Sequence, residues 1–244
     1  MLSPDELAAM LDGIPPWRIV GGSAALLVSA FCAYLAYSRG QQGGERRRAW
    51  VITLASSAVV SMAGLYFALK MIGADQYLDG LARDARHPHG ASLFSDSDAK
   101  LARTLTLFFL AYLGVDSVCA ALCYPGEIQI AYEHHAGYAL LLGYLLLTER
   151  ETLFALCAVE EIPTLIKAGF EVCGDVRPRL SIGLTIFVFR ISWHLYATYV
   201  AIAHANAPLY FLSIGLLLQH IAWFRAWFFS RVSTVRALIT TDCY

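Results

Sequence analysis

Long apolar runs separated by short polar segments dominate the pattern of this chain. Seven such runs follow a short N-terminal segment, and each approaches the roughly 20 apolar residues that a helix needs to cross a bilayer. They lie at residues 17–37, 50–71, 101–123, 131–147, 151–170, 180–203 and 208–229. The pattern predicts an all-α membrane protein with seven transmembrane helices.

Two of these runs are interrupted by ionisable residues. The fourth begins beside His134 and His135, and the fifth contains Glu160, Glu161 and Lys167. Charged side chains are costly in hydrocarbon, so such runs are the weakest candidates for spans. A bundle of six spans is therefore the alternative prediction.

The first residues differ from the rest of the chain. Ser3 and Glu6 have the spacing of a capping box that begins a short helix, and Gly13 with the Pro15-Pro16 pair ends it. We therefore expect an amphipathic N-terminal segment, a transmembrane domain and a short cytosolic tail, at residues 1–16, 17–230 and 231–244.

The basic residues predict an orientation, because cytosolic loops of membrane proteins carry an excess of Lys and Arg. One side of a seven-span bundle receives Arg39, Arg46, Arg47, Arg48, Arg177, Arg179, Arg231 and Arg236, and the other receives Arg18, Arg83, Arg86, Lys100 and Arg150. We expect a non-cytosolic N-terminus and a cytosolic C-terminus. The longest loop, 73–100, then lies on the non-cytosolic side.

Composition agrees with a membrane location and excludes several partners. The 244 residues are 58% hydrophobic and only 15% charged, whereas soluble domains are about 25% charged. The net charge is −1 and the basic residues are scattered, so no nucleic-acid partner is expected. The six cysteines form no CxxC pair, and we predict neither a metal site nor a permanently bound cofactor.

Polar residues inside the predicted spans are the candidates for function. An ionisable group in hydrocarbon tends to face the bundle interior, to pair with another group and to mark a functional site. The candidates are Tyr112, Asp116, Glu160, Glu161, Thr164, Lys167, Arg190 and His194, with His220 and Arg225 in the last run. The spacing of 160, 164 and 167 predicts three polar groups on one face of a helix.

Each candidate also has a purely structural interpretation. Arg190 with Glu160 or Glu161 would form a buried ion pair that only supports packing. The single histidines of the last two runs would only hydrogen-bond across helices. Pro163 is expected to interrupt the fifth helix beside the two glutamates.

The pair His134-His135 is the sharpest feature. Adjacent helical residues are about 100° apart, so one ring can face a cavity while the other meets a neighbouring helix. Imidazole titrates near neutral pH and acts as a general base or as a nucleophile that carries an acyl group. The alternative is an interfacial pair that anchors the end of a helix.

The ordered set of these motifs resembles the TLC-domain family, which includes ceramide synthases, translocating-chain-associated membrane proteins and small TLC-domain proteins. The resemblance covers residues 46–230 and rests on Arg48-x-Trp50, Tyr112-x-x-x-Asp116, His134-His135, Glu161-Ile162-Pro163-Thr164 and Arg190. It implies a bundle around a central lipid cavity, in the endoplasmic reticulum or a related endomembrane.

The resemblance also implies a chemistry. In ceramide synthases the paired histidines are catalytic and move an acyl group from coenzyme A to a sphingoid base. Carried over, His134 and His135 would be catalytic, with Asp116 and Glu161 orienting groups or handling protons. The His-Asp-x-x-Asp signature that follows in ceramide synthases is replaced here by residues 160–164, so the chain is nearer to the small TLC-domain proteins.

Three functions follow from this pattern. The first is an acyltransferase that uses acyl-CoA as co-substrate, with Tyr112, Glu160, Thr164, Lys167, Arg190 and His194 binding lipid or substrate. The second is a non-enzymatic lipid-binding regulator of membrane composition. The third is a cargo or assembly factor that contacts clients through loop 73–100. Membrane lipids or acyl chains are the expected partners, and a homodimer is compatible with all three.

Overall fold

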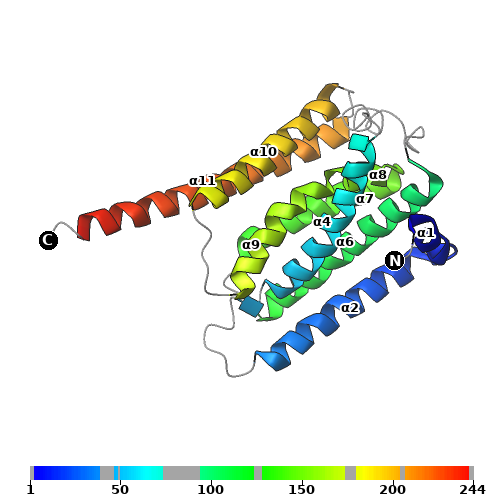
Figure 1. Cartoon of the computed structure of the whole chain (residues 1–244), viewed down its shortest axis with the longest axis horizontal. Coiled ribbons are helices and arrows are strands. Elements are labelled where there is room, and N and C mark those ends of the chain that lie inside the picture. Colours follow the sequence, from blue (N-terminus) through cyan, green and yellow to red (C-terminus); the bar gives the residue numbers. More distant parts are fainter. Residues whose placement is uncertain are drawn as a thin grey trace.

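A computed structural model describes residues 3–38, 47–48, 50–73, 94–123, 128–173, 180–203 and 207–241. All regular structure in these ranges is helical, which confirms the all-α prediction (Figure 1). The elements are α1 (Pro4–Leu11), α2 (Pro16–Tyr37), α4 (Val51–Gly73), α6 (Asp96–Cys123), α7 (Ile128–Leu147), α8 (Glu151–Cys157), the 3-10 turn η2 (Ala158–Glu160), α9 (Glu161–Cys173), α10 (Leu180–Ala203) and α11 (Ala207–Thr241).

Three helices of the described part are long and apolar enough to cross a membrane: α2, α4 over Val51–Lys70, and α6. This supports an integral membrane protein. The count of seven spans stays a prediction, as does the orientation of the two ends. Loop 73–100, from which the cargo-factor hypothesis was drawn, lies largely outside the described residues.

Large apolar side chains lie on the outside of the bundle as well as in its core. Leu26 and Met62 are 65% and 72% exposed, whereas the polar Ser57 and Thr106 are buried. The Ser57 hydroxyl donates to the carbonyl oxygen of Thr53 at 2.6 Å, and the Thr106 hydroxyl donates to that of Ala102 at 2.8 Å, each within its own helix. An apolar exterior, with such hydroxyl groups satisfied inside the helix, fits a hydrocarbon environment.

The helices pack in two connected groups. Helix α2 packs on α6, and α4 packs on α9 and η2, while α10 and α11 run side by side and join the rest mainly through α7 (Figure 1). Phe109 of α6 is buried at the centre, and its ring lies 5.2 Å from Phe154 and 6.0 Å from Tyr138. These aromatic contacts connect α6 with α7 and α8.

The described part of the chain begins with α1 and ends with α11. The capping box of α1 is confirmed, because the Ser3 side chain accepts from the N–H of Glu6 while Glu6 accepts from the N–H of Ser3. The second of these hydrogen bonds lowers the pKa of Glu6. At the other end α11 continues to Thr241, so most of the segment predicted as a tail extends the last helix.

The fifth predicted span is broken, but not at Pro163. Helix α8 ends at Cys157, the 3-10 turn follows, and α9 begins at Glu161. Pro163 therefore lies in the first turn of α9, where a missing N–H costs no intrahelical hydrogen bond. The break precedes the proline and places both glutamates where two helical segments meet.

Gly64 of α4 explains how this turn fits against its neighbour. A Cβ atom at Gly64 would lie 2.5 Å from the backbone C of Ala158 and 2.5 Å from the backbone N of Val159. No side chain fits between the two backbones. The glycine therefore sets the distance between α4 and the turn that carries Glu160.

Asp98 fixes the start of α6. Its carboxylate is fully buried and accepts from the Tyr66 hydroxyl at 2.8 Å, from the Ser95 N–H at 2.9 Å and from the Lys70 ammonium group. Tyr66 and Lys70 belong to α4, so this carboxylate joins α4 to α6. Its position in the first turn also favours a negative charge.

Gly64→Ala is expected to destabilise the protein by about 1–3 kcal/mol, because the new methyl group overpacks a backbone contact. Gly114→Ala is the matched control, since a Cβ at that helical glycine meets nothing within 4 Å. Thermal unfolding of both variants in the same detergent checks this. Equal melting temperatures for the two variants would contradict the assigned close approach.

Asp98→Asn is expected to lower the free energy of unfolding by about 1.5–3 kcal/mol, because it weakens the hydrogen bonds that Tyr66, Ser95 and Lys70 donate to a buried carboxylate. Asp96→Asn serves as the control, since Asp96 lies in the same first turn but is exposed. Denaturation monitored by tryptophan fluorescence compares the two. If both variants lost a similar amount of unfolding free energy, the hydrogen bonds of Asp98 would contribute no more than an exposed carboxylate.

Candidate functional site

A buried ion pair joins α9 to α10. The Arg190 guanidinium donates to Oε1 of Glu161 at 3.0 Å and to the Thr164 hydroxyl at 2.8 Å. The side chains of Arg190 and Glu161 are only 12% and 9% exposed. The sequence left open which glutamate pairs with Arg190, and the structure selects Glu161.

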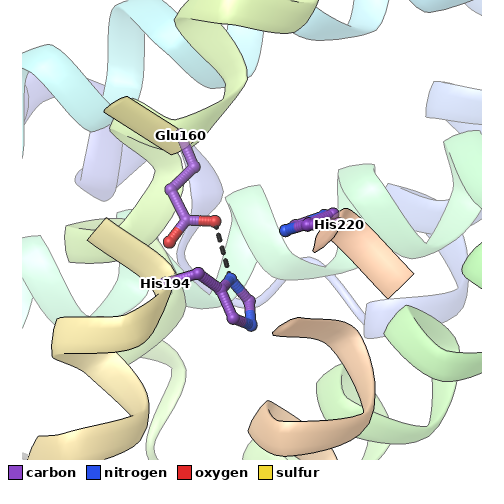
Figure 2. Close-up of side chains that lie close together, drawn as sticks. All are labelled: Glu160, His194 and His220. Atoms are coloured by element: carbon purple, nitrogen blue, oxygen red, sulfur yellow. Dashed lines mark hydrogen bonds and ion pairs between the residues drawn. The ribbon is translucent and has the colours of Figure 1, made fainter. Parts of the chain in front are cut away.

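The neighbouring Glu160 has a different partner. Its Oε2 lies 3.0 Å from Nδ1 of His194, one helical turn beyond Arg190. The His194 ring lies 4.9 Å from the ring of His220, which comes from α11. Glu160, His194 and His220 therefore converge from three elements, η2, α10 and α11 (Figure 2).

The rings of the histidine pair face different helices, as their angular separation predicts. Nδ1 of His135 lies 2.9 Å from the Ser117 hydroxyl and its Nε2 lies 3.5 Å from Asp116, both on α6. Nδ1 of His134 lies 3.2 Å from the Gln219 side-chain oxygen on α11. His135 is buried with both nitrogens engaged, whereas His134 is half-buried.

His134 lies among aromatic rings at the α7–α11 contact. Its ring is 4.5 Å from Trp223 and 4.6 Å from Tyr138. It is also 5.7 Å from His220 and 6.0 Å from His135. His134 therefore links the His135–Asp116 contacts to the cluster around His194.

Two predicted positions need separate description. Tyr112 is buried, its hydroxyl lies 3.3 Å from the Thr53 hydroxyl, and its ring lies 5.8 Å from that of His135. Lys167 is exposed, and its ammonium lies 4.5 Å from the centre of the Trp50 ring. Tyr112 thus borders the polar network, while Lys167 points to another part of the molecule.

The Arg48-x-Trp50 motif lies at the end of the bundle. Arg48 donates from Nε to the Ser38 hydroxyl at 3.0 Å and from a terminal nitrogen to the Ser38 carbonyl oxygen at 3.1 Å. Ser38 caps the C-terminus of α2. Trp50 contacts Lys167 of α9. The described contacts of this motif therefore lie outside the polar network.

Nine of the ten predicted site residues thus form one connected network, by hydrogen bonds, ring contacts or chain adjacency. These are Tyr112, Asp116, His134, His135, Glu160, Glu161, Thr164, Arg190 and His194. Ser117, Gln219 and Trp223 were missed. Their residue types carry no chemical signal alone, and only helix packing brings them to the histidines.

An open groove of about 600 Å³ runs between α7 and α11. Its lining is mainly apolar and includes Phe211, Leu212 and Leu216, with Glu133 and Gln219 as polar members. Trp223 also lines it, so the groove shares two residues with the surroundings of His134. The groove is lined by residues of α7 and α11, and the central cavity that the resemblance implied stays a prediction.

Comparisons with known proteins add no assignment. No protein-family model, no curated protein and no solved structure matches this chain. The membership of the TLC-domain family stays a prediction from the ordered motifs.

Proposed function

We propose that this chain is an intramembrane lipid-handling protein of the TLC type whose α7–α11 groove holds an acyl chain beside His134. The observation that carries the proposal is the sharing of Gln219 and Trp223 between the groove and the contacts of His134. A chain lying on Phe211 and Leu212 would bring its polar end toward this imidazole.

The size and lining of the groove favour a lipid over a polar metabolite. Binding sites for small molecules commonly measure about 300–1,000 Å³ and are mostly apolar, and this groove falls within that range. An open groove on an apolar membrane protein is accessible to lipid from the bilayer. The large exposed apolar side chains of the surrounding helices, such as Leu140 and Leu218, support the same environment.

The reaction that fits the site is transfer of an acyl group from acyl-CoA to a lipid acceptor. Nε2 of His134 attacks the thioester carbonyl and the C–S bond breaks, so that an acyl-imidazolium forms and coenzyme A leaves as a thiolate that takes a proton from solvent. The amine or hydroxyl of the acceptor then attacks the acyl carbon. The N–C bond breaks, and the acceptor's proton passes to the imidazole and from there to solvent, which restores the neutral ring.

The other residues serve this reaction by holding the imidazole in place. The Gln219 amide oxygen contacts Nδ1 of His134, which leaves Nε2 for chemistry. Asp116 and Ser117 fix His135, whose ring contacts His134. His135 is therefore a positioning residue in this proposal.

The groove alone also supports the second function, a lipid-binding regulator that catalyses nothing. In that case His134 contacts the headgroup of a stored lipid, and no acyl-imidazole forms. If the protein is an acyltransferase, we propose that acyl-CoA is the acyl donor and that the protein resides in an endomembrane. The two functions share the ligand and differ in product formation.

Gly215→Leu is expected to reduce the amount of lipid that co-purifies with the protein, because Gly215 lines the groove and a larger side chain there occupies it. A Cβ at this position meets nothing within 4 Å, so the substitution fills space without a backbone clash. Gly143→Leu on α7 is the matched control, since Gly143 is also unobstructed and does not line the groove. Quantitative lipid mass spectrometry measures both, and equal lipid in both would remove the groove from the proposal.

His134→Gln is expected to reduce acyl transfer by at least about 100-fold, because a base or carrier of this kind contributes that much or more. The protein is incubated with acyl-CoA and a mixture of sphingoid-base and lysophospholipid acceptors. Intact-protein mass spectrometry detects an added acyl group, and lipid mass spectrometry detects the product. Tyr132→Phe is the control, because Tyr132 is exposed and contacts the Ser117 carbonyl rather than the groove.

Product formation by a folded His134→Gln variant at the wild-type rate would eliminate the histidine mechanism. A wild-type protein that carries lipid but forms no product would identify the regulator instead. Matching circular-dichroism spectra and elution volumes ensure that the compared variants are folded.

A further inference from the structure

Glu160, His194 and His220 form a compact group of metal-ligating side chains. One ligand atom from each residue lies within 4.8 Å of the others. Figure 2 shows the side chains pointing toward one another from three separate elements. Their exposed fractions are 4%, 6% and 1%, so the group is closed to bulk solvent.

The hydrogen bonds of this group are incomplete. Oε1 of Glu160, Nε2 of His194 and both ring nitrogens of His220 are buried and have no hydrogen-bond partner among the described residues. A buried polar atom left unsatisfied is destabilising, because it has lost its hydrogen bonds to water and gained none in the protein. Several such atoms on three converging side chains indicate a ligand that accepts their lone pairs.

Charge balance points to a cation. Arg190 is paired with Glu161 at 3.0 Å, and the described partner of Glu160 is His194, also at 3.0 Å. A divalent cation bound by neutral imidazoles would balance the Glu160 carboxylate. It would also accept the lone pair of one ring nitrogen from each histidine.

The ligand types narrow the choice of metal. Two imidazoles and one carboxylate are the protein ligands of many catalytic Zn²⁺ sites and of non-haem Fe²⁺ sites. Ca²⁺ and Mg²⁺ prefer oxygen ligands, so two histidines disfavour them. Three protein ligands also leave at least one coordination position open.

From these observations we infer that Glu160, His194 and His220 bind a divalent transition-metal ion, with Zn²⁺ as the best-fitting probe, in the buried centre of this protein. The sequence alone predicted no metal site, and this proposal departs from that expectation. It goes beyond the proposed function, because a metal-binding site here does not depend on acyl transfer. The ring of His220 lies 5.7 Å from that of His134, which in turn contacts the groove residues Gln219 and Trp223. The metal site therefore lies close to the groove.

The sequence alone does not reveal this group of ligands, because its members are far apart in the chain. His194 and His220 belong to different helices and Glu160 to a third element, so no short spacing motif connects them. A metal-binding pair on one helix would show the spacing of neighbouring turns. Here the packing of α10 against α11 and of η2 against α10 creates the site.

The test measures metal binding without any acyl donor. Full-length protein in detergent is stripped with a chelator, titrated with ZnCl₂, and analysed by elemental mass spectrometry after gel filtration. We expect about one Zn²⁺ per chain and a higher melting temperature when Zn²⁺ is present. Co²⁺ loaded in place of Zn²⁺ should give the visible absorption bands of a low-symmetry nitrogen–oxygen site.

Glu160→Gln and His220→Asn are expected to lower Zn²⁺ affinity at least about 100-fold, because each removes a direct ligand and even outer-shell substitutions cost 10–100-fold. Glu151→Gln is the matched control for metal content, since Glu151 is a buried glutamate that pairs with Arg103 instead. The control should bind Zn²⁺ as tightly as the wild-type protein.

Two results would overturn the metal site. One is folded wild-type protein that takes up no Zn²⁺ and gives no Co²⁺ spectrum, which would leave ordered water as the occupant. The other is Zn²⁺ uptake that is equal in the wild type and in both ligand variants, which would show binding elsewhere. The wild-type Co²⁺ spectrum decides the matter even if a variant fails to fold. Neither result bears on acyl transfer, which is measured separately.

Discussion

Where α4 meets the turn at Ala158–Glu160, two backbones lie against each other with only the hydrogen of Gly64 between them. The fifth apolar run breaks at this contact, which holds the turn that carries Glu160 against α4. Glu160 ends the 3-10 turn and Glu161 begins α9, so neighbouring carboxylates reach different partners on α10. Any change in this distance would move both carboxylates relative to Arg190 and His194.

The polar centre of the molecule follows from that arrangement. Burying a charge is expensive unless it is paired and hydrogen-bonded. Arg190 is paired with Glu161 and Thr164, although its Nε has no described partner, whereas the described partner of Glu160 is an imidazole. The buried charge is therefore better paired at Arg190 than at Glu160, and the Glu160 end is the one that suits a ligand.

The apolar runs made the helices predictable, because local hydrophobicity and the absence of breakers determine them. The break near Pro163 was placed a few residues late, since its position is set by contact with Gly64, which is distant in the chain. The same limit applies to the candidate site. Polar residues in apolar runs identified Arg190, His134 and their neighbours, but helix packing alone associates His220 with Glu160. Lys167 has the helical spacing of the site residues Glu160 and Thr164, but its long side chain contacts the ring of Trp50.

Helix α11 continues without interruption for 35 residues, which at about 1.5 Å per residue corresponds to roughly 52 Å. A bilayer core is about 30 Å thick, so a helix of this length spanning it extends well beyond the hydrocarbon on at least one side. His220 lies within this same rod. A rotation of the C-terminal part of α11 would thus reach the buried imidazole, because the helix has no break between His220 and Thr241.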